Sequence, residues 1–497
     1  MGTIIVLVFV VGYLAITLEH NLKIDKLIPA LVMMAISWAL IALGIDSFPQ
    51  WFDSAKHTLL DNFGLLGHEE KMHLMEETLL HHLGKTAEIL VFLLGAMTIV
   101  EIIDYFDGFS TIKGFIKTKS KKRVLWIFGF LAFFLSAIID NLTATIVLIS
   151  ILQKLIGNRD VRIWYAGLII IAANAGGAWS PIGDVTTTML WIGKKVTTGH
   201  LFVYLFVPSL LCMLVPTFIA SFLPAFKGKL EDTEEKEDKP KNKHSSKMLY
   251  LGLGGIVSVP IFKTVTHLPP YVGMMLALGI VAVFAEIYSN SKFAMSATVD
   301  EDSDYEGSHS PIHHSLSKIE MPSILFFLGI LMAVAALESL GILFGFASTL
   351  QDSMPMLGTE IHHGGVSDLV VLLLGVGSAV IDNVPLVAAS LGMFTEGLDN
   401  ELWHFIAYSA GTGGSMLIIG SAAGVVAMGM EKIDFFWYLK KISWLALIGF
   451  LVGAAAFMFT RTIELPSDTD AEHTAAHAAE HASVSTSINE SADILKL

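Results

Sequence analysis

Two short motifs place a carboxylate beside an amide in the middle of long apolar stretches. They are Asp140-Asn141 and Asp382-Asn383. Hard cations such as Na⁺ prefer carboxylate, amide and carbonyl oxygens, and a helix that unwinds at such a motif also frees backbone carbonyls. Each aspartate could instead only cap the helix that follows it. Because Ser or Asn would cap without carrying a charge into lipid, the motifs favour a cation or proton site in which capping can coexist.

A third carboxylate, Asp184, closes a glycine-rich break that begins at Gly176, and the corresponding break later in the chain ends at Ser421. This charge is therefore found in one break only. Desolvation favours the protonated form of a carboxylate and a bound cation favours the ionised form, so such a group can exchange a cation for protons. Neutral oxygen donors beside the breaks could complete the site or could only bond to their own backbone. They are Asn174, Ser180, Thr412 and Ser415.

Three further acidic residues lie toward the ends of apolar stretches and are second-line candidates for the site, together with Ser421. They are Glu101, Asp104 and Glu338. A carboxylate at a helix end can also simply reach interfacial water. The segment 51–85 carries five histidines among apolar residues at helical spacing, which predicts an amphipathic segment on the outer surface. Its histidines would either sense pH or form a solvated polar face.

The composition is that of a membrane protein. Of the 497 residues, 54% are hydrophobic and only 15% are charged, whereas about a quarter of a soluble domain is charged. The net charge of −15 argues against a nucleic-acid partner, and the lone Cys212 excludes an intrachain disulfide. No Cys/His spacing resembles a structural zinc site, and no cofactor is indicated besides the ions themselves.

Apolar stretches of spanning length occur throughout the chain. Eight are uninterrupted: 3–18, 27–45, 86–106, 201–223, 248–266, 269–287, 322–346 and 441–460. Four are interrupted by polar or glycine-rich residues: 124–156, 163–193, 368–394 and 402–430. The first run has no basic region before it and no cleavage site after it, so we expect it to be a retained span.

The interruptions recur in the same order along the chain. The Ile-Asp-Asn motif at 139–141 returns at 381–383, an offset of 242, and the Gly-Gly pair at 176–177 returns at 413–414, an offset of 237. We therefore predict two related halves, each with six apolar units. The predicted organisation is a first repeat (1–223), a charged linker (224–247), a second repeat (248–460) and a disordered tail (461–497).

The distribution of basic residues selects the topology. If both Asp-Asn motifs are tips of re-entrant hairpins, one face of the membrane holds 23 of the 31 basic residues; if both segments cross, the count is 14 against 17. The positive-inside rule favours the hairpins. The prediction is an all-α polytopic protein of two inverted repeats, each with five transmembrane helices, one of them broken, plus one hairpin. It would lie in the inner (plasma) membrane with a cytoplasmic linker and both termini extracytoplasmic.

The segment 138–148 (Ile-Ile-Asp-Asn-Leu-Thr-Ala-Thr-Ile-Val-Leu), the segment 174–187 and the second Ile-Asp-Asn motif resemble the NhaD-type sodium/proton antiporters of the ion transporter superfamily. The resemblance covers about residues 1–460. It implies electrogenic exchange of cytoplasmic Na⁺ or Li⁺ for external H⁺ by an elevator-type movement, commonly in a homodimer. The residues that it implicates are Asp140, Asn141, Thr143, Asn174, Asp184, Thr186, Asp382 and Asn383.

Three other functions remain as alternatives. Anion, arsenite and dicarboxylate carriers of the same superfamily share the architecture, but paired carboxylates at the hairpin tips would repel an anion, and the dicarboxylate carriers resemble one another in having Ser-Asn-Thr there. An intramembrane aspartyl protease also needs two buried aspartates, but its Gly-x-Gly-Asp motif is incomplete before Asp184. A passive channel has no use for two inverted broken-helix units. We therefore predict a transporter and not an enzyme.

Overall fold

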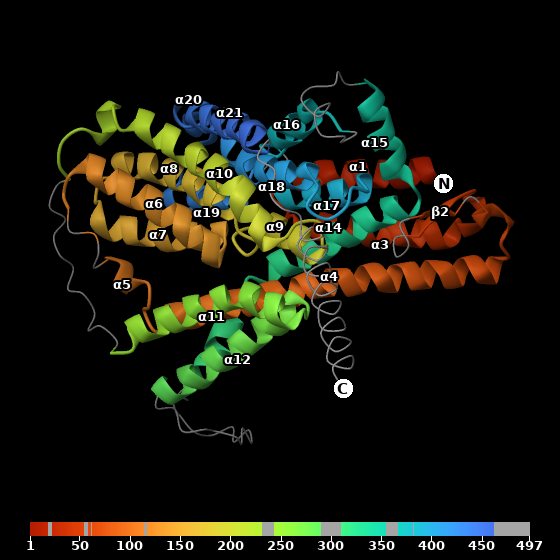
Figure 1. Ribbon diagram of the computed structural model, residues 1–497, viewed down its shortest axis with the longest axis horizontal. Coiled ribbons are helices and arrows are strands. Elements are labelled where there is room, and N and C mark those ends of the chain that lie inside the picture. The colour runs from red at the N-terminus through yellow and green to blue at the C-terminus, as the bar shows by residue number, and fades with distance from the viewer. Residues whose placement is uncertain are drawn as a thin grey trace, which may run out of the picture. The chain divides into compact units, whose positions relative to one another are not determined.

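The computed structural model describes residues 1–17, 22–53, 58–60, 62–113, 116, 118–230, 243–289, 310–353, 366–380 and 382–461. Within these residues the fold is helical apart from one antiparallel β-hairpin (Figure 1). Seven helices are long and apolar enough to cross a membrane: α4 (His68–Tyr105), α6 (Lys121–Ile139), α10 (Thr198–Ala220), α11 (Ser245–Thr266), α12 (Pro270–Ser289), α14 (Met321–Ser339) and α21 (Ser443–Thr460). The segments predicted to be disordered, in the linker, near residue 300 and beyond residue 461, lie outside the described residues.

The broken units are pairs of shorter helices. In the first half they are α6 with α7 (Asn141–Leu155), and α8 (Arg159–Gly177) with α9 (Val185–Ile192). In the second half they are α16 (Asp368–Gly377) with α17 (Asn383–Met393), and α18 (Glu401–Gly413) with α19 (Ala422–Glu431). Polar or glycine-rich residues end each first helix at the place that the sequence predicts.

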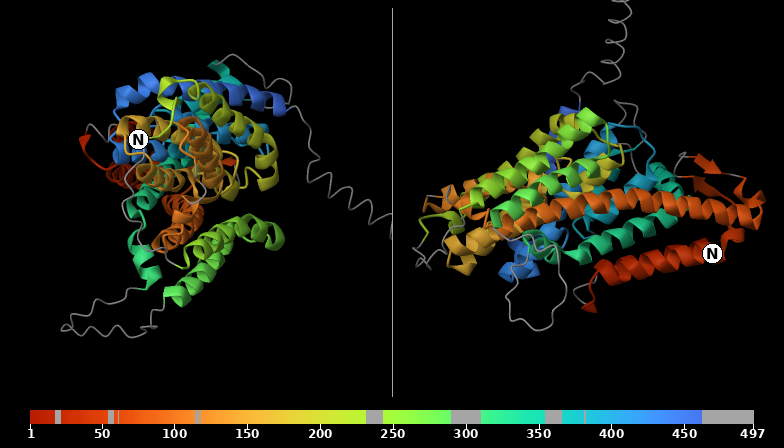
Figure 2. Two further views of the ribbon diagram at one scale, coloured as in Figure 1. Left: turned by 90° about the vertical axis from the view of Figure 1, so that its left-hand side faces the viewer. Right: turned by 90° about the horizontal axis from the view of Figure 1, so that it is seen from below.

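Helix packing sorts the chain into two groups. In one group, α3 (Leu27–Leu43) packs on α1 (Gly2–Thr17) and α14, and α4 packs on α12 and α14. In the other group, α8 packs on α6, α7, α10 and α19, and α18 packs on α16, α17 and α10. The pair α11 and α12 lies beside α4, as Figure 2 also shows. The two groups meet where α17 packs on α14 and where α9 packs on α4.

Small and large apolar side chains hold α1, α3 and α14 together. Ala30 and Met33 of α3 are buried against Phe326 and Ile330 of α14. The indole nitrogen of Trp38 donates to the carbonyl oxygen of Met332 at 2.8 Å. Removing these side chains from contact with water or lipid fixes the position of the N-terminal end of α3.

The prediction of one amphipathic segment over 51–85 is wrong in its first part. Trp51–Asp53 and Thr58–Leu60 form the antiparallel strands β1 and β2. The helix begins only at His68, where the Glu70 carboxylate accepts a hydrogen bond from the backbone N–H of Gly67 at 3.0 Å. The Trp51 indole then donates to Thr78 on α4 at 3.1 Å. The hairpin therefore folds back on an extension of α4 instead of continuing it.

Candidate functional site

The tip of the first hairpin is held by a side-chain cap. Asp140 is the N-cap residue of α7, and its carboxylate accepts hydrogen bonds from the backbone N–H and the hydroxyl of Thr143, both at 2.8 Å. Its φ of +73° lies in a region that glycine favours, and such a residue stores about 1–3 kcal/mol of strain. The cap and the unusual backbone together fix the direction of this carboxylate.

The tip of the second hairpin has the same Asp-Asn motif but a different partner. Asp382 precedes α17 with an ordinary φ of −45° and makes no capping hydrogen bond. Its carboxylate instead forms an ion pair with Lys26, at 2.8 Å from Nζ to Oδ2. The reason lies three residues further on, because the residue equivalent to Thr143 is Pro385, which has no backbone N–H to donate.

Asp184 lies between the two tips. It is 2% exposed and caps α9 by accepting from the backbone N–H and the hydroxyl of Thr186 at 2.9 and 3.0 Å. Its other oxygen accepts from the side-chain amide of Asn141 at 2.7 Å and from that of Asn383 at 3.2 Å. One buried carboxylate therefore receives an amide from each hairpin.

Two further side chains extend these contacts. The amide of Asn141 also donates to the Asn174 carbonyl at 3.0 Å, and the amide of Asn174 donates to the hydroxyl of Ser421 at 3.0 Å. Ser421 in turn caps α19. We refer to these six residues as the Asp184 network: Asn141, Asn174, Asp184, Thr186, Asn383 and Ser421.

Some predicted site residues bond to their own backbone instead, which is the alternative that the sequence left open. Thr412 donates to the Tyr408 carbonyl at 2.7 Å, and Ser415 donates to the Thr412 carbonyl. The hydroxyl of Ser180 accepts from the backbone N–H of Ile182 at 3.4 Å. These three hydroxyls support the turns at the breaks.

The second-line acidic candidates lie on other helices. Glu101 and Asp104 are near the end of α4, where Glu101 is partly exposed and Asp104 is exposed. Glu338 is near the end of α14, close to Gly392 of α17. None of them is among the six residues of the Asp184 network.

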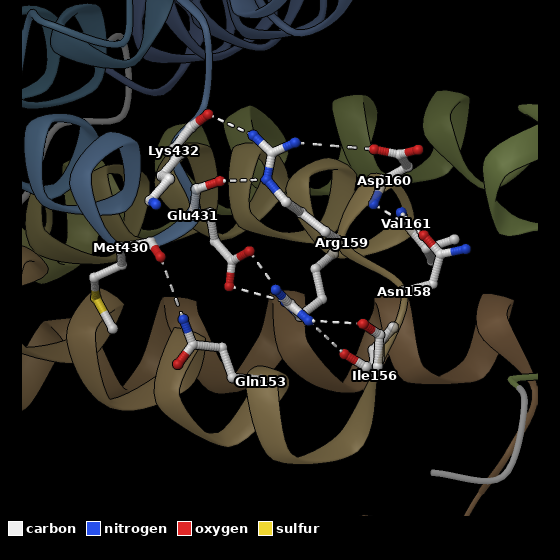
Figure 3. Close-up of polar contacts among 11 residues, drawn as sticks. Gln153, Ile156, Asn158, Arg159, Asp160, Val161, Met430, Glu431 and Lys432 are labelled. Carbon is white, nitrogen blue, oxygen red and sulfur yellow. Dashed lines mark hydrogen bonds and ion pairs between the residues drawn. The ribbon is translucent and has the colours of Figure 1, made fainter.

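A buried ion pair fixes α19 against the first hairpin (Figure 3). The Arg162 Nε lies 3.0 Å from both carboxylate oxygens of Glu431, and Arg162 also donates to the Ile156 carbonyl at 2.9 Å. Arg159 donates to the backbone carbonyl of Glu431 at 3.0 Å. Glu431 is 2% exposed. The end of α19 and the connection between α7 and α8 are therefore held as one unit.

A second polar cluster joins the start of α10 to the start of α18. Asp399 accepts from the backbone N–H of Thr197 at 2.7 Å and lies 3.0 Å from His200 Nδ1 and 3.4 Å from His404 Nε2. Partial burial raises the pKa of Asp399, but the hydrogen bonds from His404 and Thr197 outweigh it and hold this pKa below its ordinary value. Asp399 is thus ionised at neutral pH and ties the two broken helices together at this end.

Lys26 is a residue of the site that the sequence does not reveal. It counts there only as one basic residue beside an apolar stretch, and 356 positions separate it from Asp382. No periodicity or motif connects residues so far apart, so only the packing of α3 and α14 brings them together.

Comparisons with known proteins agree on one kind of protein. A family model described as citrate transporter matches residues 13–404. Sodium/proton antiporter 1 of Arabidopsis thaliana is 39% identical over 469 residues, which are 93% of this chain and 73% of the relative. Sodium/proton antiporter 2 of the same plant is 37% identical, over 92% of this chain and 100% of the relative. The Na(+)/H(+) antiporter NhaD of Alkalimonas amylolytica is 31% identical, over 92% and 90%.

Proposed function

This chain belongs to the NhaD-type Na⁺/H⁺ antiporters of the ion transporter superfamily, and we propose that it exchanges cytoplasmic Na⁺ for external H⁺ by alternating access. It is a multi-pass membrane protein and a transporter, not an enzyme. The observation that carries the proposal is the position of Asp184, a buried carboxylate that accepts amides from both hairpins. A charge at this position is costly unless a cation or a proton compensates it.

In the proposed cycle, Na⁺ and protons compete for the carboxylates of Asp140, Asp184 and Asp382. A cation that enters replaces the amide donors at Asp184, and the amide carbonyls of Asn141 and Asn383 can then turn to it as ligands. Thr143, Asn174, Thr186 and Ser421 hold these groups in place, and Thr412 and Ser415 support the breaks. Protonation removes the charge that binds the cation, so external protons release it.

The same argument disfavours the superfamily's anionic substrates. Three carboxylates within or beside the network give a site that repels citrate, dicarboxylate or an oxyanion, unless all are protonated. The family model's description therefore indicates shared architecture more than shared substrate. Transport of Li⁺ and assembly as a homodimer are further parts of the proposal and rest on the resemblance.

We also propose that the two halves are inverted repeats. Equivalent contacts support this, since Ser136 donates to the Ala173 carbonyl at 2.6 Å and Ser378 donates to the Ala410 carbonyl at 2.8 Å, at the offsets of 242 and 237. A Cβ at Gly176 would collide with the Phe133 carbonyl, and a Cβ at the equivalent Gly413 would collide with the Gly375 carbonyl. Only glycine permits these close approaches.

The proposed orientation places the linker inside and both termini outside. Cysteine labelling in intact cells, after replacing Cys212, tests it at an exposed linker residue, Lys243, and at Ser485 in the tail. Ser245 is a poorer choice because it is buried. We expect Ser485→Cys to react with an impermeant reagent and Lys243→Cys to react only after permeabilisation. Reaction of both from the same side would contradict the two-hairpin topology.

The test of function is dye-quench transport in everted vesicles, with Na⁺, Li⁺ and K⁺ in turn and with citrate, a dicarboxylate and arsenite as controls. We expect proton movement on addition of Na⁺ and loss of at least about 90% of it in Asp184→Asn, because the charged ligand is removed. Asp160→Asn is the matched control, since the side chain of Asp160 is 88% exposed on α8. Equal activity of the two variants, normalised to folded protein, would contradict the role of Asp184.

A further inference from the structure

The ion pair between Lys26 and Asp382 joins the two helix groups at the proposed cation site. Lys26 directly precedes α3, whose position is fixed by packing on α1 and α14. Asp382 directly precedes α17 in the second hairpin, which packs on α18 as well as on α14. The ammonium therefore reaches the hairpin tip from a neighbouring structural group, not from the hairpin itself.

The ammonium of Lys26 occupies a position suited to a monovalent cation. It lies 2.8 Å from a carboxylate oxygen of Asp382 and 4.5 Å from the ring centroid of Phe326, which is fully buried on α14. The Lys26 and Asp382 side chains are 24% and 13% exposed. A carboxylate and an aromatic face in such shielded surroundings both stabilise positive charge.

The first hairpin differs at this point. The Asp140 carboxylate is satisfied by the backbone N–H and hydroxyl of Thr143. Among the residues that the structure describes, no basic side chain forms an ion pair with Asp140. One tip thus carries its own cation, whereas the other leaves its negative charge to be neutralised from outside the chain.

We propose that Lys26 is a resident competitor of the transported cation at Asp382. The inference rests on the proposed role of Asp382 as a cation ligand. Na⁺ that binds to Asp382 displaces the ammonium, which remains over the Phe326 ring, and departure of Na⁺ lets Lys26 return. The competition lowers the apparent Na⁺ affinity and prevents the empty site from keeping an uncompensated carboxylate.

The test compares Lys26→Gln with Lys26→Arg and with Lys23→Gln in the full-length protein in proteoliposomes. Lys23 lies in the same connection and is exposed, so its variant controls for removal of one positive charge. Exchange is measured against Na⁺ concentration, with choline chloride holding the ionic strength constant. We expect Lys26→Gln to lower the Na⁺ concentration for half-maximal exchange about three- to tenfold, and the two other variants to stay within about twofold of wild type.

A second measurement keeps the inference testable if Lys26→Gln turns over slowly. Na⁺ that binds the folded state raises its melting temperature, and the Na⁺ concentration at half of this rise reports binding without transport. The same three- to tenfold decrease is expected there. An unchanged or increased half-saturation concentration in Lys26→Gln, in both measurements, would overturn the inference.

Asp382→Asn separates this inference from the proposed function. If Asp382→Asn loses exchange while Lys26→Gln behaves as Lys23→Gln, Asp382 remains a ligand and only the competition is wrong. If Asp382→Asn keeps wild-type exchange and Na⁺ affinity, both the role of Asp382 and the inference about Lys26 are wrong.

Discussion

The two hairpin tips have the same Asp-Asn pair but use it differently. Asp140 caps its own helix through Thr143, at the expense of a strained backbone, whereas Asp382 has a relaxed backbone and pairs with Lys26. The difference follows from one position, because Pro385 cannot donate the hydrogen bond that Thr143 donates. Identical candidate ligands can thus differ in charge compensation because of a residue that is not itself a ligand.

The two breaks that follow the hairpins differ in the complementary way. Asp184 and Ser421 are both N-caps, with extended backbones at φ −150° and −146°. Only the first carries a charge, and both tip amides turn to it. The halves therefore share a framework but divide the charges unequally: one half supplies Asp140 and Asp184, and the other supplies Asp382 with its lysine.

The largest expected effect concerns the two tip carboxylates. Asp140→Asn and Asp382→Asn should each lower Na⁺-dependent exchange at least about 30-fold, because each removes a charged ligand. Their stabilities should differ. Asparagine caps helices well and tolerates positive φ, so Asp140→Asn should melt near wild type. Asp382→Asn deprives Lys26 of its carboxylate and should lose about 1–2 kcal/mol.

Exchange per folded protein and thermal melting in detergent measure these two effects. Asp160→Asn again controls for loss of a carboxylate at an exposed position. Normal Na⁺-dependent proton movement in folded Asp140→Asn would remove the first tip from the site. Equal melting temperatures of the two variants would show that the tips do not differ in charge compensation.

Much of this framework was predictable from the sequence, and the family prediction is confirmed. Breaks in apolar stretches have local causes, namely Asp-Asn, Gly-Gly and Pro, so the ends of α6, α8 and α18 lie within a few residues of their predicted positions. The importance of Asp184 also has a local signal, because a charge replaces Ser421 at one of two equivalent positions. The roles of Thr412 and Ser415 depended on side-chain rotamers, which spacing does not determine.

The remaining contacts depend on packing between distant segments. Lys26 meets Asp382 only because α3 packs on α14, and Arg162 meets Glu431 only because α19 packs on α8. The β-hairpin after α3 was missed because its strands are only three residues long, too short for a period of two to be distinguished from a helical one. Such features have no signal within a single sequence window.

The next effect concerns the two tip amides. Asn141 donates to both Asp184 and Asn174, at 2.7 and 3.0 Å, whereas Asn383 reaches only Asp184, at 3.2 Å. Asn141→Ala should therefore raise the Na⁺ half-saturation concentration about tenfold and Asn383→Ala about threefold, given about 1 kcal/mol for each hydrogen bond lost. Na⁺ titration of exchange measures both. The opposite order would mean that these hydrogen bonds do not determine ligand position.

A smaller effect concerns the cap of the first tip. Thr143→Val removes the hydroxyl that donates to Asp140 and should destabilise the protein by about 1 kcal/mol, while Thr143→Ser should retain the hydrogen bond. Thermal melting measures the difference, and Thr412→Val is a comparison in which only a hydrogen bond to helix backbone is lost. If Thr143→Val and Thr143→Ser melt alike, the hydroxyl does not hold the Asp140 carboxylate.

The smallest effect is expected when the first tip is copied into the second. Pro385→Thr restores the backbone N–H and the hydroxyl that cap Asp140 in the first half, so Asp382 gains donors that compete with Lys26. The cap is worth about 1 kcal/mol, and the lost rigidity of proline costs about 0.4–1 kcal/mol, so stability should hardly change. The measurable consequence is coupling. In the Pro385→Thr background, Lys26→Gln should change the Na⁺ half-saturation concentration less than about twofold, because the carboxylate is already engaged. Pro385→Ala, which restores only the N–H, should fall between the two cases. A full three- to tenfold response to Lys26→Gln in Pro385→Thr would mean that the residue at 385 does not decide how Asp382 is compensated, and that the two tips differ because Lys26 is within reach of only one of them.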